Sequence, residues 1–143
     1  KVNMNYNIQS MWYRAPEIIF HFKYDYSIDV WSMGCIIFEI IYGKALFTGK
    51  TNEVLFKNIV SFLGVPSDKF QNTNKTIREY FTLNNTPIIK CKPDDILSMD
   101  KKISFINSYN NKNIVDIIYG SLTWSVKNRY NIEKCLSKIN ELI

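Results

Sequence analysis

Residues of the types that usually do chemistry are sparse in this sequence. His21 is the only histidine, which excludes metal binding by a pair of histidines and leaves little room for a histidine-dependent catalytic triad. Cys35, Cys91 and Cys135 are widely separated and form no C-x-x-C pair, so neither a zinc site nor a disulfide framework is predicted. This cysteine usage is typical of a reducing, intracellular compartment, the cytoplasm or the nucleus. We therefore predict no metal centre in this chain.

Two carboxylates are placed where their surroundings are otherwise apolar. Glu17 lies within "SMWYRAPEIIF", residues 10–20, and Asp29 lies in the first turn of "SIDVWSMGCIIFEIIY", residues 27–42. A carboxylate that is buried needs a cation or hydrogen-bond donors, so each acid predicts a partner elsewhere in the fold if it is buried. For Asp29 the start of a helix is a sufficient reason by itself, because the helix dipole favours an acid there.

The elements that must position these side chains are predicted to be helices, which indicates an all-α fold. No stretch has the alternation of a strand, and the hydrophobic period is helical over residues 17–20, 27–42, 51–63, 113–122 and 131–142. Residues 27–42 are apolar on every face, which predicts a buried central helix, capped by Asp25 or Ser27 and ended by Gly43. About residues 65–100 we expect an irregular insert with one short helix. The last helix is expected to turn four side chains inward: Ile132, Leu136, Ile139 and Leu142.

The bulk composition indicates one globular domain. The 143 residues are 46% hydrophobic, which is enough for a sizeable core. The net charge of +5 comes mostly from scattered lysines, a pattern that favours a solvated surface over a nucleic-acid-binding patch. The apolar run at residues 30–42 is too short to cross a bilayer, and no signal peptide is visible. We expect neither a membrane nor a nucleic acid as a partner.

Three motifs in this order resemble the C-terminal lobe of the eukaryotic protein kinases. Residues 15–17, A-P-E, match the end of the activation segment, and residues 29–35, D-V-W-S-M-G-C, match the buried central helix of that lobe. Residues 122–136, "LTWSVKNRYNIEKCL", are similar to the L-x-x-D-P-x-x-R-x-T-x-x-x-x-L pattern near its end. The likeness is to the CMGC group, which includes the cyclin-dependent, MAP and CLK-type kinases. It implies a helical C-terminal lobe, with residues 1–143 forming part of a kinase domain.

The resemblance assigns Ser10, Tyr13 and Arg14 to substrate binding. Ser10 matches a hydroxyl of the substrate-facing loop, and Arg14 matches an arginine that holds a loop carbonyl and so shapes a pocket favouring proline after the acceptor. Without the resemblance, Ser10 is an ordinary loop hydroxyl and Arg14 is a surface charge. Asn7 and Met11 stand where several of these kinases carry an activating phosphotyrosine and its arginine, so activation by tyrosine phosphorylation at this site is not expected.

The resemblance also assigns four residues to the support of the site: Glu17, Asp29, Trp31 and Arg129. Glu17 matches an acid that pairs with an arginine more than a hundred residues onward, where Arg129 stands; the alternative is two unrelated surface charges. In kinases the acid that Asp29 matches accepts hydrogen bonds from the catalytic loop. Without that loop, Asp29 is expected to face water, to find another donor or to have a raised pKa. We therefore predict that the isolated chain is marginally stable or aggregates and that Asp29→Asn stabilises it. We also predict that residues 27–42 expose an apolar patch on the face that would meet the missing half.

The motifs with which kinases bind ATP and metal are absent from this sequence. They are a Gly-rich loop, a strand lysine, a helix glutamate, H-R-D-x-x-x-x-N and D-F-G, and in the family they precede A-P-E. We therefore expect a fragment from which the N-terminal lobe and the catalytic loop are absent. The intact kinase is expected to use ATP and Mg²⁺ to phosphorylate Ser or Thr of protein substrates. This chain alone is expected to hold no catalytic residue, to bind no cofactor and to be inactive.

Two further stretches indicate the branch of the group. "NIQS", residues 7–10, and "REYFTLNNTPIIKCKPDDIL", residues 78–97, resemble the SR-protein, CLK and DYRK-type kinases, some of which act on Arg/Ser-rich splicing factors. The partners implied are protein substrates and the missing N-terminal half of the kinase. The alternative is a non-catalytic, kinase-derived module that binds other proteins. Coding sequence ahead of Lys1 with H-R-D and D-F-G would decide for the kinase.

Overall fold

The computed structural model describes residues 5, 7–71, 75–82, 84, 86–88 and 93–142. Its helices are, in chain order, η1 (Met11–Tyr13), α1 (Pro16–Ile19), α2 (Ser27–Tyr42), α3 (Asn52–Leu63), α4 (Asp68–Gln71), α5 (Lys75–Arg78), α6 (Pro93–Ser108), α7 (Lys112–Ser121) and α8 (Ile132–Asn140). The predicted all-α fold is confirmed, since β-pairing within the described residues is limited to an isolated bridge between Phe81 and Pro87.

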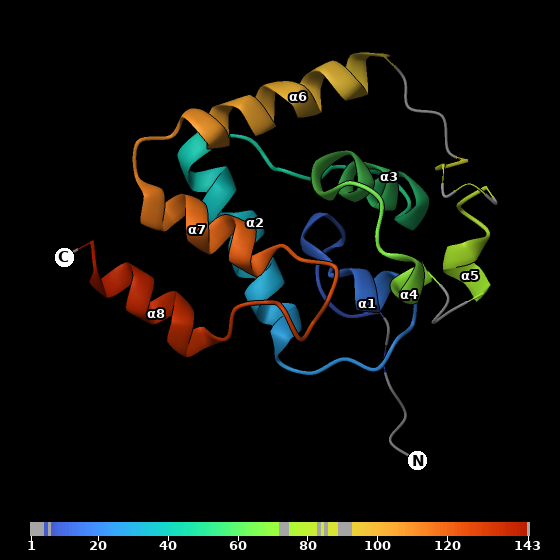
Figure 1. Cartoon of the computed structure of the whole chain (residues 1–143), viewed down its shortest axis with the longest axis horizontal. Helices are drawn as coiled ribbons and strands as arrows, with labels where there is room; N and C mark the ends of the chain where they lie inside the picture. The colour runs from blue at the N-terminus through green and yellow to red at the C-terminus, as the bar shows by residue number, and fades with distance from the viewer. Residues whose placement is uncertain are drawn as a thin grey trace.

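Helix α2 is the centre of the fold, as predicted. Figure 1 shows α7 crossing α2, with α8 packed on the far side of α7 and α1 and α3 on the other side of the molecule. Gly34 lets α2 and α7 approach closely, because a Cβ at this position would lie 2.7 Å from Ser121 Cβ. The largest fully buried side chains belong to α2, α3 and the loop between them: Trp31, Phe38, Phe47 and Phe56.

The two ends of α2 lie where the sequence predicts them, but its burial does not match the prediction. Asp25 Oδ1 accepts the N–H of Ser27 at 2.9 Å, and Gly43 ends the helix in the left-handed region with a φ of 81°. Ile36 and Ile40, however, are 47% and 75% exposed. The expectation of burial on every face is therefore wrong, whereas apolar exposure on this helix was expected; no element of the described chain covers this stripe.

Helices α3 and α7 are confirmed to within one residue. Their first turns are capped by side chains, with Thr51 Oγ1 accepting the N–H of Val54 at 3.3 Å and Asn111 Oδ1 accepting that of Ile114 at 3.2 Å. The predicted inner stripe of α3 is buried: Leu55, Ile59 and Phe62.

The last part of the expected insert, from Pro93 onward, is helical rather than irregular. Helix α6 begins at Pro93 and extends over 16 residues to Ser108. Proline suits the first helical position, and the acids Asp94 and Asp95 in the first turn are favoured by the helix dipole. These signals are visible in the sequence, and the neighbouring prolines and polar residues obscured them. Residues 72–74 and 89–92 of the insert lie outside the described residues.

Helix α8 turns inward only part of the predicted face: Ile139 is partly buried and packs in the cluster of Cys135, as expected. Ile132, Leu136 and Leu142 are 49%, 50% and 40% exposed, whereas Cys135 is fully buried. Asn131 caps the helix as the sequence allows, accepting the N–H of Lys134 at 2.9 Å. Cys135 packs against Ile117 of α7 and Val30 of α2, so only a narrow stripe of α8 that includes Cys135 is covered.

The structure also bears on the predictions about membranes and cysteines. No described helix combines the length and the apolar character needed to cross a bilayer. Cys35 and Cys135 are buried free thiols, and burial raises the pKa of Cys35 far above its usual value, which keeps the thiol protonated. Cys91 lies outside the described residues.

Candidate functional site

The loop ahead of α1 has an unusual backbone at Gln9. Its φ of 64° lies in the left-handed region, which costs a residue with a Cβ roughly 1–2 kcal/mol. This conformation directs the Gln9 carbonyl to Arg14, whose Nη2 donates to it at 3.3 Å. Arg14 Nη1 donates to Asn52 Oδ1 at 2.9 Å, which ties the loop to the start of α3. The carbonyl contact expected of Arg14 is therefore present in the fold.

Gln9 and Ser32 hold this loop through hydrogen bonds that the sequence reasoning missed. Gln9 Nε2 donates to the Ile28 carbonyl at 2.8 Å and to Ser32 Oγ at 2.7 Å, and Gln9 Oε1 accepts the N–H of Ala15 at 3.0 Å. Ser32 Oγ donates to the Tyr13 carbonyl at 2.9 Å. A left-handed glutamine has no signature in a single sequence, so these contacts could be found only in the fold.

Ser10 and Tyr13 lie on the same loop in different settings. Ser10 is exposed and precedes η1, where its carbonyl accepts the N–H of Tyr13 at 3.0 Å. The Tyr13 hydroxyl donates to Glu39 Oε2 at 2.5 Å, and this hydrogen bond to a carboxylate, aided by burial, raises the pKa of the phenol. The Ser10 hydroxyl is thus open to a ligand, whereas the Tyr13 hydroxyl is bound to α2.

Glu17 and Arg129 form the buried ion pair that the resemblance implies. Arg129 Nη1 and Nη2 donate to Glu17 Oε1 and Oε2 at 2.5 and 3.0 Å, a bidentate arrangement across 112 residues of sequence. The same two nitrogens donate to the carbonyls of Ser27 at 2.9 Å and Thr123 at 3.1 Å. Glu17 and Arg129 are only 3% and 6% exposed, so the alternative of two surface charges is wrong.

Trp31 packs between this ion pair and the core. Its ring is fully buried and stacks on Phe47, with centroids 5.8 Å apart and planes 16° apart. Arg129 Cζ lies 5.3 Å from the centroid of the indole, within the range of a cation–π contact. One guanidinium therefore joins α1, the start of α2 and the loop before α8.

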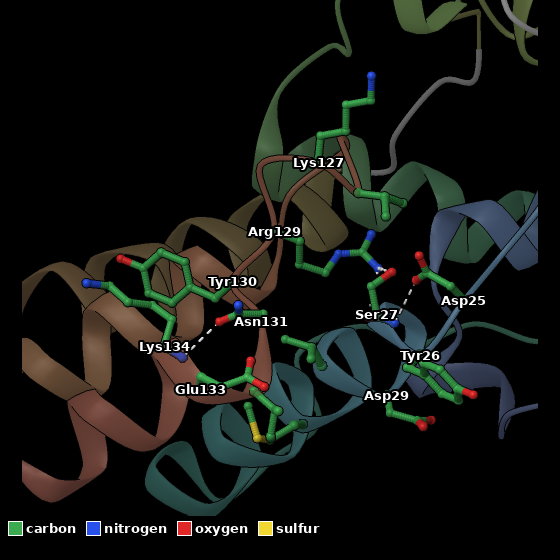
Figure 2. Close-up of a pocket in the computed structure, with 14 residues that line it drawn as sticks. Asp25, Tyr26, Ser27, Asp29, Lys127, Arg129, Tyr130, Asn131, Glu133 and Lys134 are labelled. Carbon is green, nitrogen blue, oxygen red and sulfur yellow. Dashed lines mark hydrogen bonds between the residues drawn. The ribbon is translucent and has the colours of Figure 1, made fainter.

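Asp29 faces water, the first of the three alternatives that the sequence allowed, because its side chain is exposed. It lies in the first turn of α2 and points away from Arg129 (Figure 2). The carboxylate is hydrated and near the positive end of the helix dipole. The prediction that Asp29→Asn stabilises the chain assumed an uncompensated buried acid, and that assumption is wrong because Asp29 is exposed.

Replacing Asp29 by asparagine is instead expected to lower the free energy of unfolding by less than about 1 kcal/mol, since a favourable charge at the helix start is lost. Urea unfolding at pH 7 measures the change. Glu133→Gln is the matched control, because Glu133 is another exposed acid in the first turn of a helix. Stabilisation by Asp29→Asn alone would mean that this carboxylate is poorly hydrated.

An open groove of about 1040 Å³ lies between the start of α2 and the α7–α8 connection. Figure 2 shows Arg129 and Ser27 at its wall, with Lys127 and Lys134 on one side and Asp25 and Asp29 on the other. Its charges are of both signs, and no three His, Cys, Asp or Glu side chains of the described chain are grouped to bind a metal.

Comparison with known proteins agrees with this geometry. The model of the family described as "Protein kinase domain" matches residues 1–139. The chain is 40% identical to the serine/threonine-protein kinase prpf4B of Dictyostelium discoideum over 94 residues, which are 66% of this chain and 12% of that protein. It is 32% identical to the mitogen-activated protein kinase SLT2/MPK1 of Saccharomyces cerevisiae over 132 residues, 90% of this chain and 25% of that protein.

A third relative is the putative dual specificity tyrosine-phosphorylation-regulated kinase 3 homolog of Drosophila melanogaster, 39% identical over 80 residues, 56% of this chain and 10% of that protein. The chain thus spans about a quarter or less of the length of these three relatives. The family match covers nearly all of residues 1–143, and the buried Glu17–Arg129 pair and the Arg14 contact lie where the resemblance places them. This chain belongs to the protein kinase domain family.

Proposed function

We propose that residues 1–143 are the substrate-binding and supporting part of a serine/threonine protein kinase domain. In the intact enzyme, ATP and Mg²⁺ are held by a preceding N-terminal half that carries the Gly-rich loop, H-R-D and D-F-G motifs. The products are phosphorylated Ser or Thr residues of protein substrates. On this view the chain acts inside the cell, and alone it neither binds nucleotide nor transfers phosphate.

The observation that carries the proposal is the contact between Arg14 and the carbonyl of Gln9. With that carbonyl turned inward, the loop offers no acceptor to the backbone N–H of the residue after the phosphorylated one. An ordinary residue there would leave its N–H unsatisfied, at a cost of about 1–3 kcal/mol. Proline has no N–H and avoids this cost. The geometry therefore favours substrates in which proline follows the acceptor.

Two finer alternatives belong to the same proposal. An Arg/Ser-rich substrate, such as a splicing factor, is supported by the likeness of residues 78–97 to the SR-protein and CLK-type kinases, although much of that stretch lies outside the described residues. A non-catalytic module that binds proteins is supported by the exposed Ile36 and Ile40.

The decisive experiment joins residues 1–143 to the N-terminal half of the prpf4B relative, up to the residue before its matching segment. We expect the chimera to phosphorylate Ser–Pro peptides from ATP and Mg²⁺ about tenfold or more better than Ser–Ala peptides. The unjoined chain is the control and is expected to give no heat on titration with ATP and Mg²⁺. A folded chimera without phosphotransfer, beside an active relative, would favour the binding module. Preference for Arg/Ser peptides without proline would favour the splicing-factor class.

A further inference from the structure

The inward carbonyl of Gln9 depends on a backbone conformation that the residue does not favour. Only glycine adopts a φ near 64° without a steric cost, and the sequence places a glutamine there. The single contact from Arg14 Nη2, at 3.3 Å, is long for a hydrogen bond of this kind. Another interaction must hold the loop in this shape.

The side chain of Gln9 supplies that interaction. Its two amide N–H groups reach across to α2, where one meets the carbonyl of Ile28 and the other meets Ser32 Oγ. Its oxygen accepts the N–H of Ala15, the residue before α1. The orientation of the amide is determined, because the exchanged arrangement would set an oxygen against the Ile28 carbonyl and an NH₂ against the Ala15 N–H. The amide thus bridges the loop, α1 and α2.

A phosphate at position 7 paired with a cation at position 11 cannot hold the loop in this chain. Asn7 has no hydroxyl to carry a phosphate, and Met11 has no charge with which to bind one. Met11 is partly buried against the core. The hydrogen bonds of Gln9 therefore hold the loop in place of an ion pair, which positions 7 and 11 cannot form.

We propose that Gln9 is a positioning and specificity-determining residue: its amide locks the left-handed loop onto α2, keeps its own carbonyl on Arg14, and so sets the preference for proline without phosphorylation of this loop. The specificity rests on the proposed function, whereas the lock is a property of this chain. Gln9→Met keeps the length of the side chain and removes all three hydrogen bonds. Gln9→Glu keeps the shape and makes the bonds dependent on pH.

The first experiment measures amide hydrogen exchange in the 143-residue chain by NMR. In Gln9→Met, the protection factor of the Ala15 N–H should fall about tenfold, while the amides of α3 keep theirs. Gln71→Met is the matched control, since Gln71 also donates to a carbonyl, that of Pro66, and accepts from Arg78. It should leave Ala15 unchanged. Unchanged protection of Ala15 in Gln9→Met would overturn the lock.

In the Gln9→Glu variant the protection of Ala15 should return at low pH, and general loosening of the structure would not produce this recovery. At pH 7.5 its carboxylate faces the Ile28 carbonyl, so Ala15 should lose protection. When the new acid is protonated at low pH, its O–H donates to the Ile28 carbonyl and its other oxygen accepts the N–H of Ala15. Protection of Ala15 should return there, relative to the intrinsic rate at each pH. No recovery, with the α3 amides still protected, would contradict the lock.

The second experiment measures specificity in the chimera. Gln9→Met should lower the ratio of kcat/KM for Ser–Pro over Ser–Ala peptides about tenfold, mainly through better use of Ser–Ala, because the freed carbonyl can accept the extra N–H. Gln71→Met should leave the ratio unchanged. A ratio that persists in Gln9→Met despite loss of Ala15 protection would overturn the specificity role. If the wild-type chimera transfers no phosphate, the proposed function fails, and the exchange result still decides the lock.

Discussion

Replacing Arg129 by alanine is expected to lower the free energy of unfolding by about 3–5 kcal/mol. The change leaves the carboxylate of Glu17, 3% exposed, without its cation. It also removes the donors from the carbonyls of Ser27 and Thr123. A typical domain is stable by roughly 5–15 kcal/mol, so the variant should be close to unfolding at room temperature. Denaturant unfolding followed by circular dichroism measures the loss.

Two control variants test whether the loss comes from burying Glu17 without a partner rather than from the loss of any ion pair. Lys138→Ala breaks an ion pair with Asp116 at the surface, 3.0 Å long, and should change stability by no more than the error of the measurement. Combining Glu17→Leu with Arg129→Met removes both charges and should cost less than Arg129→Ala alone, because no carboxylate remains buried. A loss below about 1 kcal/mol for Arg129→Ala would show that water compensates Glu17.

Replacing Trp31 by alanine is expected to cost about 3–5 kcal/mol as well, for a different reason. The side chain is fully buried, and its removal leaves a cavity beside Phe47 that the surrounding helices fill only in part. The guanidinium of Arg129 also loses the ring that it faces at 5.3 Å. Thermal and denaturant unfolding measure the loss, and unfolding of the double variant with Arg129→Ala tests the coupling.

Trp31→Phe is the matched control for Trp31→Ala. It keeps an aromatic ring for Phe47 and removes the indole Nε1, which is buried without a hydrogen-bond partner in the described part of the chain. Its cost should therefore be clearly below that of alanine. The double variant should cost less than the sum of the single changes, by about 0.5–2 kcal/mol, because Arg129 and Trp31 are in contact. Strict additivity would mean that the cation–π contact contributes nothing.

The sequence by itself determined the elements that depend on local signals. The α2 helix follows from an apolar run that Gly43 ends as predicted; at its start Asp25 accepts the N–H of Ser27, although Tyr26 holds the N-cap position. Caps and helical periodicity are short-range properties, so one sequence contains them. The pairing of Glu17 with Arg129 was accessible only through the ordered motifs of a family, since no local rule connects positions 112 residues apart.

Tertiary structure alone decided which surfaces are covered. The apolar residues Ile36, Ile40 and Ile132 are exposed because burial depends on what packs over a face, and periodicity cannot say what does. For the same reason Asp29 is exposed, whereas Glu17, an acid with similarly apolar sequence neighbours, is buried. The left-handed Gln9 is also a product of the fold: its cost is offset by partners on α2 and at Ala15, which only the folded chain brings within reach of one amide.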